Sequence, residues 1–252
     1  MSERTGRKHY SHSVYADPAT ARTFDDRRFG GPIGALIASD QARVLSNFVG
    51  RIHGRRILDV GTGTGRAALL FARGGAKVTA VDASEAMLAF AQRRAADERA
   101  DIRFLVGDAQ SLDFPDRSFD VVVSLRLMMH APNWRACVAE LCRVADRLVI
   151  LDYPSRRSVA LFHSSARRIF SALGVRTEPY RVFSHKEIVK ALERSGFRVR
   201  SLHRQFVLPI ALHKLMGSRR LTAATEGFLD RAGLLKIFGS PVTLVAERCV
   251  IS

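Results

Sequence analysis

Short apolar runs alternate with longer helix-like runs through the middle of this 252-residue chain. The apolar runs, many of them β-branched, occupy residues 57–60, 78–81, 102–106, 121–124 and 148–151, and helical spacing is found at 66–73, 85–96 and 134–144. This alternation is typical of a parallel sheet with crossover helices. With two later strand candidates, at 197–203 and 242–248, we predict a doubly wound α/β fold with a mostly parallel, seven-stranded sheet and helices on both faces.

The first predicted strand runs into a glycine-rich turn, which contains Asp59, Gly61, Thr62, Gly63 and Gly65. In the dinucleotide fingerprint the third glycine comes three residues after the second, and the strand before the turn is apolar. Here the third glycine comes two residues after the second, and Asp59 would repel a pyrophosphate. A carboxylate at this place suits the cationic amino and sulfonium end of S-adenosylmethionine, which we therefore favour over NAD.

Three further polar places follow the next strands, at the carboxyl ends where α/β sheets bind ligands. Asp82 is placed to accept both ribose hydroxyls of S-adenosylmethionine. Asp108 can accept the adenine amino group while the N–H of Ala109 meets a ring nitrogen, and Ser124 lies near the expected methyl group. Taken singly, Asp82 is explained as well by capping a helix together with Ser84, and Asp108 as a turn residue. Together and in this order they indicate one ligand.

In these motifs the chain resembles the class I S-adenosylmethionine-dependent methyltransferases over roughly residues 55–152. The segments that carry the likeness are 58–65, 81–88, 106–109 and 114–120. Within that class the chain is similar to the small-molecule subgroup that includes ubiquinone and menaquinone methyltransferases, on account of segments 129–134 and 140–144.

The resemblance implies a Rossmann-like methyltransferase fold and assigns roles to individual residues. Asp82, followed by Ala83, would hold the ribose, Met87 would pack on the adenine, and Asp108 with Ala109 would read the adenine edge. One departure is visible, because residues 145–147 replace the family's Pro-Gly-Gly turn before the fifth strand. This departure puts the local turn, and the substrate wall beside it, in doubt.

Methyl transfer mainly requires that a nucleophile be held in line with the carbon–sulfur bond of the donor. A general base is needed only if the acceptor must lose a proton as it attacks. His130, soon after the fourth strand, is the candidate we favour. An equally weighted interpretation is that His130 only stabilises the loop before Trp134. Weaker candidates are Asp152, Tyr10, His12 and Tyr15.

Three regions outside the predicted sheet are expected to cover the site. We divide the chain into an N-terminal helical cover, residues 1–50, and a core, residues 51–252, with insertions at about 154–183 and 205–240. The first region contains a predicted helix at 33–48, and the first insertion contains a basic amphipathic pattern at 156–173. Ser184 and Glu187 form a capping-box pattern that predicts a helix between the two insertions, which Gly196 can close.

Positive charge is concentrated in one part of the chain. The formal net charge is +16, and residues 154–220 contain 15 Lys or Arg against three acidic residues, a net of +12. Such a segment suits nucleic acid, an anionic membrane surface or an acidic substrate. Because 34 of the 40 basic residues are Arg, the overall excess fits a GC-rich genome equally well.

These observations predict a methyltransferase that acts on a small, lipophilic acceptor by O- or C-methylation, with peripheral contact between the 154–220 segment and an anionic membrane as an added hypothesis. One alternative is an RNA methyltransferase whose basic segment follows phosphates. Against it, residues 124–127 do not match the Asp/Asn-Pro-Pro-Tyr motif of base-amine methyltransferases. A second alternative is a non-catalytic protein that keeps a cofactor-shaped fold.

Cysteine usage and hydropathy indicate the compartment. The three cysteines, Cys137, Cys142 and Cys249, form no Cys-x-x-Cys pair, which argues against a disulfide framework and a zinc site. No apolar stretch reaches the roughly 18 residues of a membrane span. We therefore expect a cytoplasmic protein without a metal.

Overall fold

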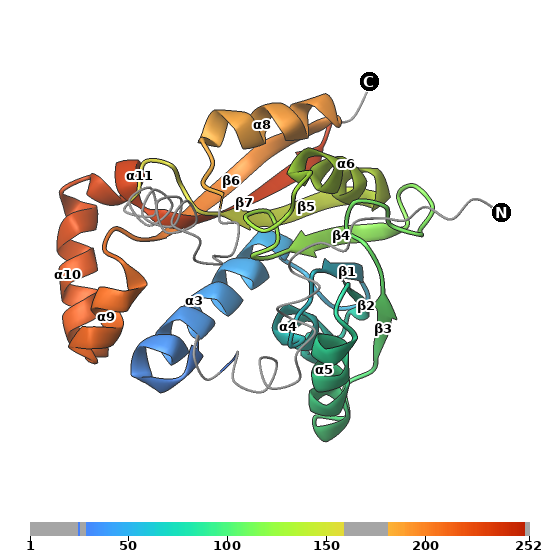
Figure 1. Ribbon diagram of the computed structural model, residues 1–252, viewed down its shortest axis with the longest axis horizontal. Coiled ribbons are helices and arrows are strands. Elements are labelled where there is room, and N and C mark those ends of the chain that lie inside the picture. The colour runs from blue at the N-terminus through green and yellow to red at the C-terminus, as the bar shows by residue number, and fades with distance from the viewer. Residues whose placement is uncertain (1–24, 26–28, 159–180, 250–252) are drawn as a thin grey trace, which may run out of the picture.

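The computed structural model (Figure 1) describes residue 25 and residues 29–158 and 181–249. Seven strands form one sheet in the order β3-β2-β1-β4-β5-β7-β6. The strands are β1 (Arg56–Val60), β2 (Lys77–Asp82), β3 (Ile102–Val106), β4 (Phe119–Ser124), β5 (Ala145–Tyr153), β6 (Phe197–Phe206) and β7 (Ser240–Arg248). Strands β1 to β5 pair in parallel, and β7 is antiparallel to both β5 and β6. The predicted fold class is confirmed.

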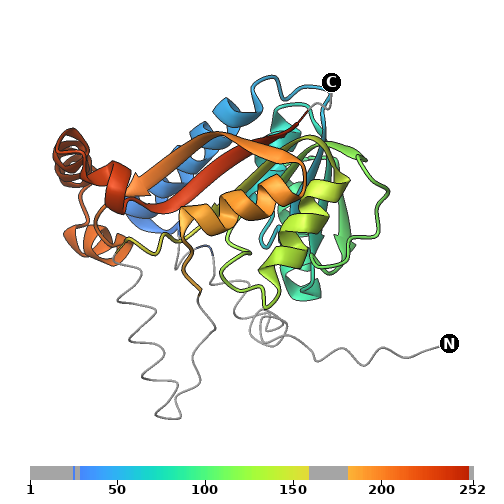
Figure 2. The same ribbon diagram turned by 90° about the horizontal axis from the view of Figure 1, so that it is seen from above.

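Helices connect the strands and cover both faces of the sheet (Figures 1 and 2). They are α3 (Gly31–Val49), α4 (Arg66–Arg73), α5 (Glu85–Asp97), α6 (Trp134–Val144), α8 (His185–Arg194), α9 (Ile210–Met216), α10 (Arg219–Arg231) and α11 (Leu234–Phe238). The capping box at the start of α8 is present, with Ser184 and Glu187 each bonded to the other's backbone N–H. The helix predicted at 156–173 lies outside the described residues from position 159 onwards, and residues 156–158 form a turn.

Alternate residues of the central strands build a core on each face of the sheet. Leu58 and Val60 of β1 pack with buried residues of α6 and α8, whereas Ile57 packs with α3 and α4. Because both faces are covered, the middles of the central strands are mostly apolar, and polar residues gather near the strand ends. The polar ends of β1, β2 and β4 therefore meet at one edge of the sheet.

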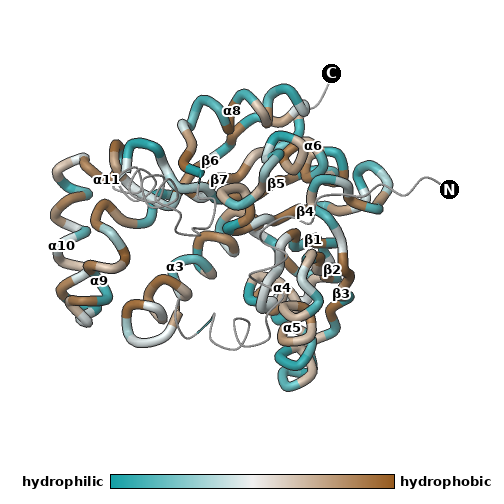
Figure 3. The backbone as a smooth tube through the Cα atoms, viewed as in Figure 1, coloured by the Kyte–Doolittle hydropathy of each residue, from teal (hydrophilic) through white to brown (hydrophobic). Residues whose placement is uncertain are grey.

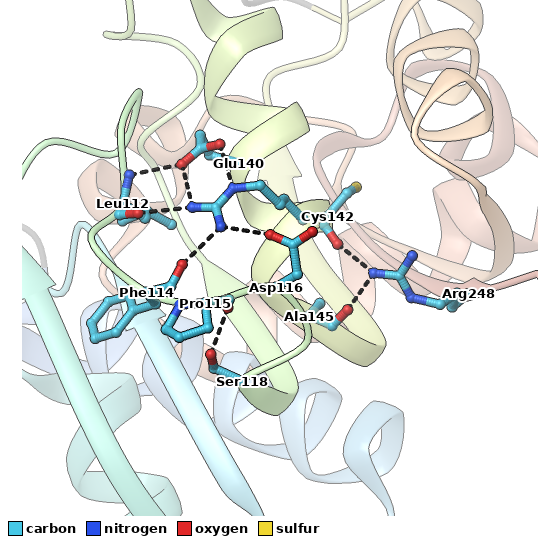
Figure 4. A network of polar contacts seen from close by, with 10 residues as sticks. Leu112, Phe114, Pro115, Asp116, Ser118, Glu140, Cys142, Ala145 and Arg248 are labelled. Atoms are coloured by element: carbon cyan, nitrogen blue, oxygen red, sulfur yellow. Dashed lines mark hydrogen bonds and ion pairs between the residues drawn. The ribbon is translucent and has the colours of Figure 1, made fainter.

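The start of β5 differs from the expectation that a turn precedes it. Helix α6 ends at Val144 and the strand begins directly at Ala145, so residues 145–147 form no separate turn. The Arg248 side chain on the neighbouring strand donates to the carbonyl oxygens of Cys142 and Ala145 (Figure 4). A guanidinium thus satisfies backbone oxygens at the helix end that a Pro-Gly-Gly turn would otherwise have to accommodate.

Helix α3 connects the sheet to the helices that follow β6. Its C-terminal half, with Leu45 and Phe48, packs on the face of the sheet that carries Ile57. Ile33 and Ile37 form a separate small core with Phe206. Asp40 of α3 accepts hydrogen bonds from the side chains of His203, at 2.9 Å, and Gln205, at 3.1 Å. Two regions far apart in the sequence are therefore joined into one cover.

Candidate cofactor site and active site

The glycine turn after β1 has a backbone conformation that only glycine adopts without strain. Gly61, Gly63 and Gly65 have φ values of +71°, +55° and +79°. A Cβ at Gly61 would lie 3.2 Å from Leu127, and one at Gly65 would lie 3.0 Å from Ala91. A Cβ at Gly63 would meet no described atom within 4 Å. The first and third glycines thus allow close packing, and the second borders open space where a ligand can approach the backbone.

Asp82, at the end of β2, holds this turn in place. Its Oδ2 accepts a hydrogen bond from Gly63 N at 2.8 Å, and its Oδ1 accepts one from Ser84 N at 2.9 Å. Ser84 is the N-cap of α5 and accepts from Met87 N at 3.2 Å. Both interpretations of Asp82 therefore have a basis, since it braces the start of α5 and also lies beside the second glycine. Ribose binding by Asp82 stays a prediction.

Asp59 places a carboxylate inside the site. The residue is buried, and its Oδ2 accepts hydrogen bonds from Thr62 Oγ1 at 2.7 Å and from Ala68 N at 3.1 Å. Burial raises the pKa of Asp59 to about 6, against the lowering effect of these two hydrogen bonds. A cationic group bound next to Asp59 would favour its ionised form. The carboxylate therefore fits the cationic end of the proposed ligand.

The loop after β3 carries the residues predicted to read adenine. Asp108 is exposed and its Oδ1 accepts from Gln110 N at 2.9 Å, whereas Ala109 is half-buried against the main core. Ala83 is half-buried after β2, and Met87, in the first turn of α5, is 3% exposed. These four residues flank the glycine turn at the carboxyl ends of β2 and β3, and their contacts with a ligand stay predictions.

An arginine network fixes the same loop to α6, which the sequence argument did not anticipate. Arg143 donates to the carbonyl oxygens of Leu112 at 2.8 Å and Phe114 at 2.7 Å, and it forms ion pairs with Glu140 and Asp116. Glu140 also accepts from Leu112 N at 2.8 Å, so both backbone polar groups of Leu112 are bonded to α6 (Figure 4). In the sequence, Glu140 and Arg143 stand three residues apart within a segment that resembles the small-molecule subgroup. That spacing does not show which loop the two side chains bond.

Buried polar groups lie where the strands β4 and β5 end. Ser124 is 0% exposed, and its Oγ has no hydrogen-bond partner among the residues that the structure describes. Ser124 pairs with Leu151, so the next residue, Asp152, ends at the same edge of the sheet. Arg126 adopts a left-handed backbone, with φ +62°, and its N–H donates to the Asp152 carboxylate. Burial raises the pKa of Asp152.

His130 lies in the turn between β4 and α6, as the sequence predicted. Its backbone N–H donates to Leu127 O at 2.9 Å, and the residue is half-buried. Trp134 begins α6 and belongs to the core, with its ring 5.1 Å from that of Phe183 in an edge-to-face arrangement. His130 thus lies in the loop that follows β4, and its role as a base stays a prediction. Tyr10, His12 and Tyr15 lie outside the described residues.

Residues before α3 contact the turn from outside. Asp25 accepts from Thr64 Oγ1 at 2.8 Å and forms an ion pair with Arg94 at 2.6 Å. The Arg66 guanidinium lies 3.4 Å from the centre of the Phe29 ring, a cation–π contact. Asp25 and Phe29 are therefore attached to residues around the start of α4 and to α5. No sequence motif marked these contacts, because they join side chains distant in the chain.

The described residues show neither a metal-ion site nor a membrane-spanning helix. Residues 25, 29–158 and 181–249 contain no group of three or more His, Cys, Asp or Glu arranged to hold a metal ion. Within the same residues, no helix is both long and apolar enough to cross a membrane.

The strand order, the glycine turn and the polar strand ends define a Rossmann-like fold of the class I methyltransferase type. Residues 57–147 match the family model of the methyltransferase domain, which confirms the resemblance for this part of the chain. A curated demethylmenaquinone methyltransferase from Thermus thermophilus is 39% identical over 105 residues, which cover 40% of this chain and 48% of that protein. The chain thus spans about half the length of this relative, and of a similar one from Renibacterium salmoninarum.

Solved structures agree on the fold. Magnesium protoporphyrin IX methyltransferase from Synechocystis PCC 6803, solved with bound S-adenosylhomocysteine, matches with a TM-score of 0.65 and 19% identity, over 94% of this chain and 97% of that one. The cyclase SpnF matches with a TM-score of 0.59 and 21% identity, over 83% of this chain and 81% of that one. Because the names of these two proteins describe different reactions, the fold alone does not fix the chemistry.

Proposed function

We propose that this protein transfers a methyl group from S-adenosylmethionine to a small-molecule acceptor. The observation that carries the proposal is the order of four polar places, Asp59 with the glycine turn, Asp82, Asp108 and Ser124, at successive strand ends inside a matched methyltransferase domain. One solved protein with this fold, the Synechocystis methyltransferase, holds S-adenosylmethionine in one structure and its demethylated product in another. The matched domain and the polar groups at the strand ends both support the assignment.

In this proposal each strand end binds one part of the methyl donor. Asp59 receives the cationic amino end, Gly61 to Gly65 let the backbone approach the ligand, and Asp82 with Ala83 holds the ribose. Met87, Asp108 and Ala109 surround the adenine. The sulfonium supplies an activated methyl group, so the chain's own task is to hold the acceptor in line and keep water away. Ser124 lies at the edge where the methyl group is expected.

For the acceptor we propose a small, lipophilic molecule that is methylated on oxygen or carbon. The names of the relatives support this choice, since a quinone methyltransferase and a porphyrin methyltransferase are both among them. His130 is the proposed base if the acceptor loses a proton. The same proposal keeps residues 1–50 as the N-terminal cover and places peripheral contact with an anionic membrane in the segment 154–220. No observation in the described residues favours RNA or a non-catalytic role.

Thermal unfolding tests the choice of donor. We expect S-adenosylmethionine and S-adenosylhomocysteine to raise the melting temperature, since a ligand that binds only the folded state stabilises it by about 2.7 kcal/mol at roughly 100 times its dissociation constant. NAD at the same concentration should leave the melting temperature unchanged. The absence of a shift with either sulfur ligand at saturation would overturn the proposal.

The acceptor and the base require a second experiment. Comparative lipid and metabolite profiles of cells with and without the gene should differ by a mass of about 14 units in one compound, the mass of one methylene group. Once that compound is in hand, His130→Gln should lower kcat by about 10²-fold or more, if the imidazole removes a proton. Unchanged kcat would reassign His130 to the loop, while donor binding measured separately would stay intact.

A further inference from the structure

We propose that helices α9, α10 and α11, residues 210–238, form a surface that binds the headgroup region of an anionic lipid membrane. This places the membrane contact beyond most of the 154–220 segment named above, with which it shares only residues 210–220. These helices lie together at one end of the molecule, beyond β6 and away from β3 (Figures 1 and 2). The contact surface itself depends on no part of the methyl-transfer proposal. Its consequence, access to a membrane-dissolved acceptor, rests on the proposed function.

The first observation is where large apolar side chains are exposed. Eight such side chains are exposed among the described residues, and six of them fall between positions 212 and 238. The most exposed of these six are Leu215, at 84%, Phe228, at 67%, and Leu221, at 49%. Single exposed apolar residues are ordinary, but a cluster on adjacent helices marks a contact surface. Figure 3 shows apolar residues on all three helices.

The second observation is how α10 arranges these side chains. Leu221 and Phe228 are seven residues apart, and Arg220 and Arg231 are eleven apart, so each pair recurs on one side of the helix. All four side chains belong to exposed residues, whereas Thr222 and Glu226 point into the protein. An apolar row thus lies beside a basic row on the outer side of α10. This is the pattern of a helix that lies in a membrane interface.

The third observation is charge, and it selects the lipid. Arg219, Arg220, Arg231 and Lys236 are exposed and form no ion pair with any described residue. Of the two acidic residues between positions 210 and 238, Glu226 is buried against His213, which leaves Asp230 outside. Basic side chains next to apolar ones favour an anionic bilayer surface, because each Lys or Arg near it is attracted to the negative headgroups. A second copy of this chain would meet the same positive charge and be repelled.

The apolar cluster is not explained by packing within the cover. The inner sides of α9 and α10 are already occupied, since His213 and Glu226 are buried and Ile210 packs on the small core of Ile33, Ile37 and Phe206. The exposed side chains project from the opposite sides. The surface is also well separated in the sequence from the donor residues, all of which precede position 125.

Co-sedimentation with lipid vesicles tests the proposal on the full-length protein without any methyl donor. We expect binding to vesicles of phosphatidylcholine with phosphatidylglycerol, weak binding to phosphatidylcholine alone, and a decrease as salt rises. Leu221→Ser combined with Phe228→Ser should lower the partition coefficient roughly tenfold or more, and so should Arg220→Glu combined with Arg231→Glu. The melting temperatures of these variants should be unchanged, because all four side chains are exposed.

Matched controls lie at the other end of the sheet. Val106→Ser removes an apolar side chain that is 59% exposed on β3, and Arg93→Glu with Arg103→Glu reverses two exposed charges on α5 and β3. These controls should bind vesicles like the unaltered protein. No binding of the unaltered protein to anionic vesicles, equal losses in the controls, or a dimer in solution that the α10 variants dissociate would each overturn the inference. None of these outcomes would alter the ligand-induced melting shift, so the methyl-transfer proposal is judged separately.

Discussion

Two regions of the molecule satisfy their polar groups in different ways. One is the predicted donor end, around Asp59 and Asp82, and the other is the helical cover formed by α9, α10 and α11. At the donor end, Asp59 and Asp82 accept hydrogen bonds from the glycine turn and from the starts of α4 and α5. In the cover, Glu226 accepts from the backbone of positions 207 and 208 and from His213, across two helices and a turn. The first arrangement braces one turn between strand ends and helix starts, and the second joins α10 to α9 and to the segment before α9.

This difference matters for what each end can do. The donor end presents a fixed glycine turn and buried carboxylates, which suits one small charged ligand. The cover buries a His–Glu pair and exposes apolar and basic side chains, which suits contact with a broad, deformable surface such as a membrane. Under the two proposals, a few atoms would specify the methyl donor, whereas a whole face would shape access to the acceptor.

Removal of the Asp82 carboxylate should have the largest effect. Asp82→Ala removes the proposed acceptors of both ribose hydroxyls, each worth about 1.5–3 kcal/mol, and also frees Gly63 N. We expect the affinity for S-adenosylhomocysteine, measured by calorimetry, to fall by roughly a hundredfold or more. Glu85→Ala, an exposed carboxylate three residues further on, serves as the control. Affinity within about threefold of the unaltered protein would remove Asp82 from the site.

Asp59 should reveal itself through the pH dependence of stability. Its pKa is raised from 3.8 to about 6, so between these values the folded protein holds a proton that the unfolded chain has released. The stability from that proton is complete below the lower value and is lost as pH rises through about 6. Asp59→Asn keeps an oxygen for Thr62 and Ala68, so it should gain about 2–3 kcal/mol over the ligand-free parent above roughly pH 7.

Chemical denaturation at several pH values measures this difference. The gap between Asp59→Asn and its parent should be small near about pH 4 and should widen through pH 6. Asp108→Asn, which alters an exposed carboxylate, should show no such change. A constant gap across the range would mean that burial does not govern the protonation of Asp59.

Arg143 of α6 holds the predicted adenine loop from a neighbouring helix. Arg143→Lys cannot reproduce the planar contacts with Glu140, Leu112 and Phe114, so it should cost about 1–2 kcal/mol of stability and weaken donor binding severalfold. The control is Arg73→Lys, whose partner Glu98 lies at the surface. If binding is unchanged while stability falls, the network supports the fold without positioning the loop.

The donor end was readable from the sequence because its signals are local. Strand periodicity, the glycine spacing and the acidic residues directly after strands follow from backbone geometry within a few residues, and α4, α6 and β3 were placed with the bounds that the structure shows. Strand β5 was predicted too short, since Ala145 to Arg147 looked like a turn and the role of Arg248 at the helix end was not visible.

The cover could not be derived in the same way. The contacts of Asp40 with His203 and of Asp25 with Thr64 join residues far apart in the chain, and no periodic pattern encodes such pairs. The apolar run at 206–212 does not by itself show that Phe206 ends a strand inside a small core while Leu212 is exposed on α9. Composition showed the positive charge of this region but not which side chains face outward.

The smallest effect is expected in the cover itself. Glu226 Oε2 accepts from Val207 N at 2.8 Å, and Oε1 accepts from Leu208 N at 2.9 Å and from His213 Nε2 at 2.8 Å. In Glu226→Gln the amide group replaces one of these oxygens and leaves a backbone N–H without an acceptor, at a cost of about 1 kcal/mol. Thermal unfolding should show this loss, while the affinity for S-adenosylhomocysteine stays unchanged. If donor binding falls as well, the two ends are coupled through α3, because that helix contacts both the sheet and the cover.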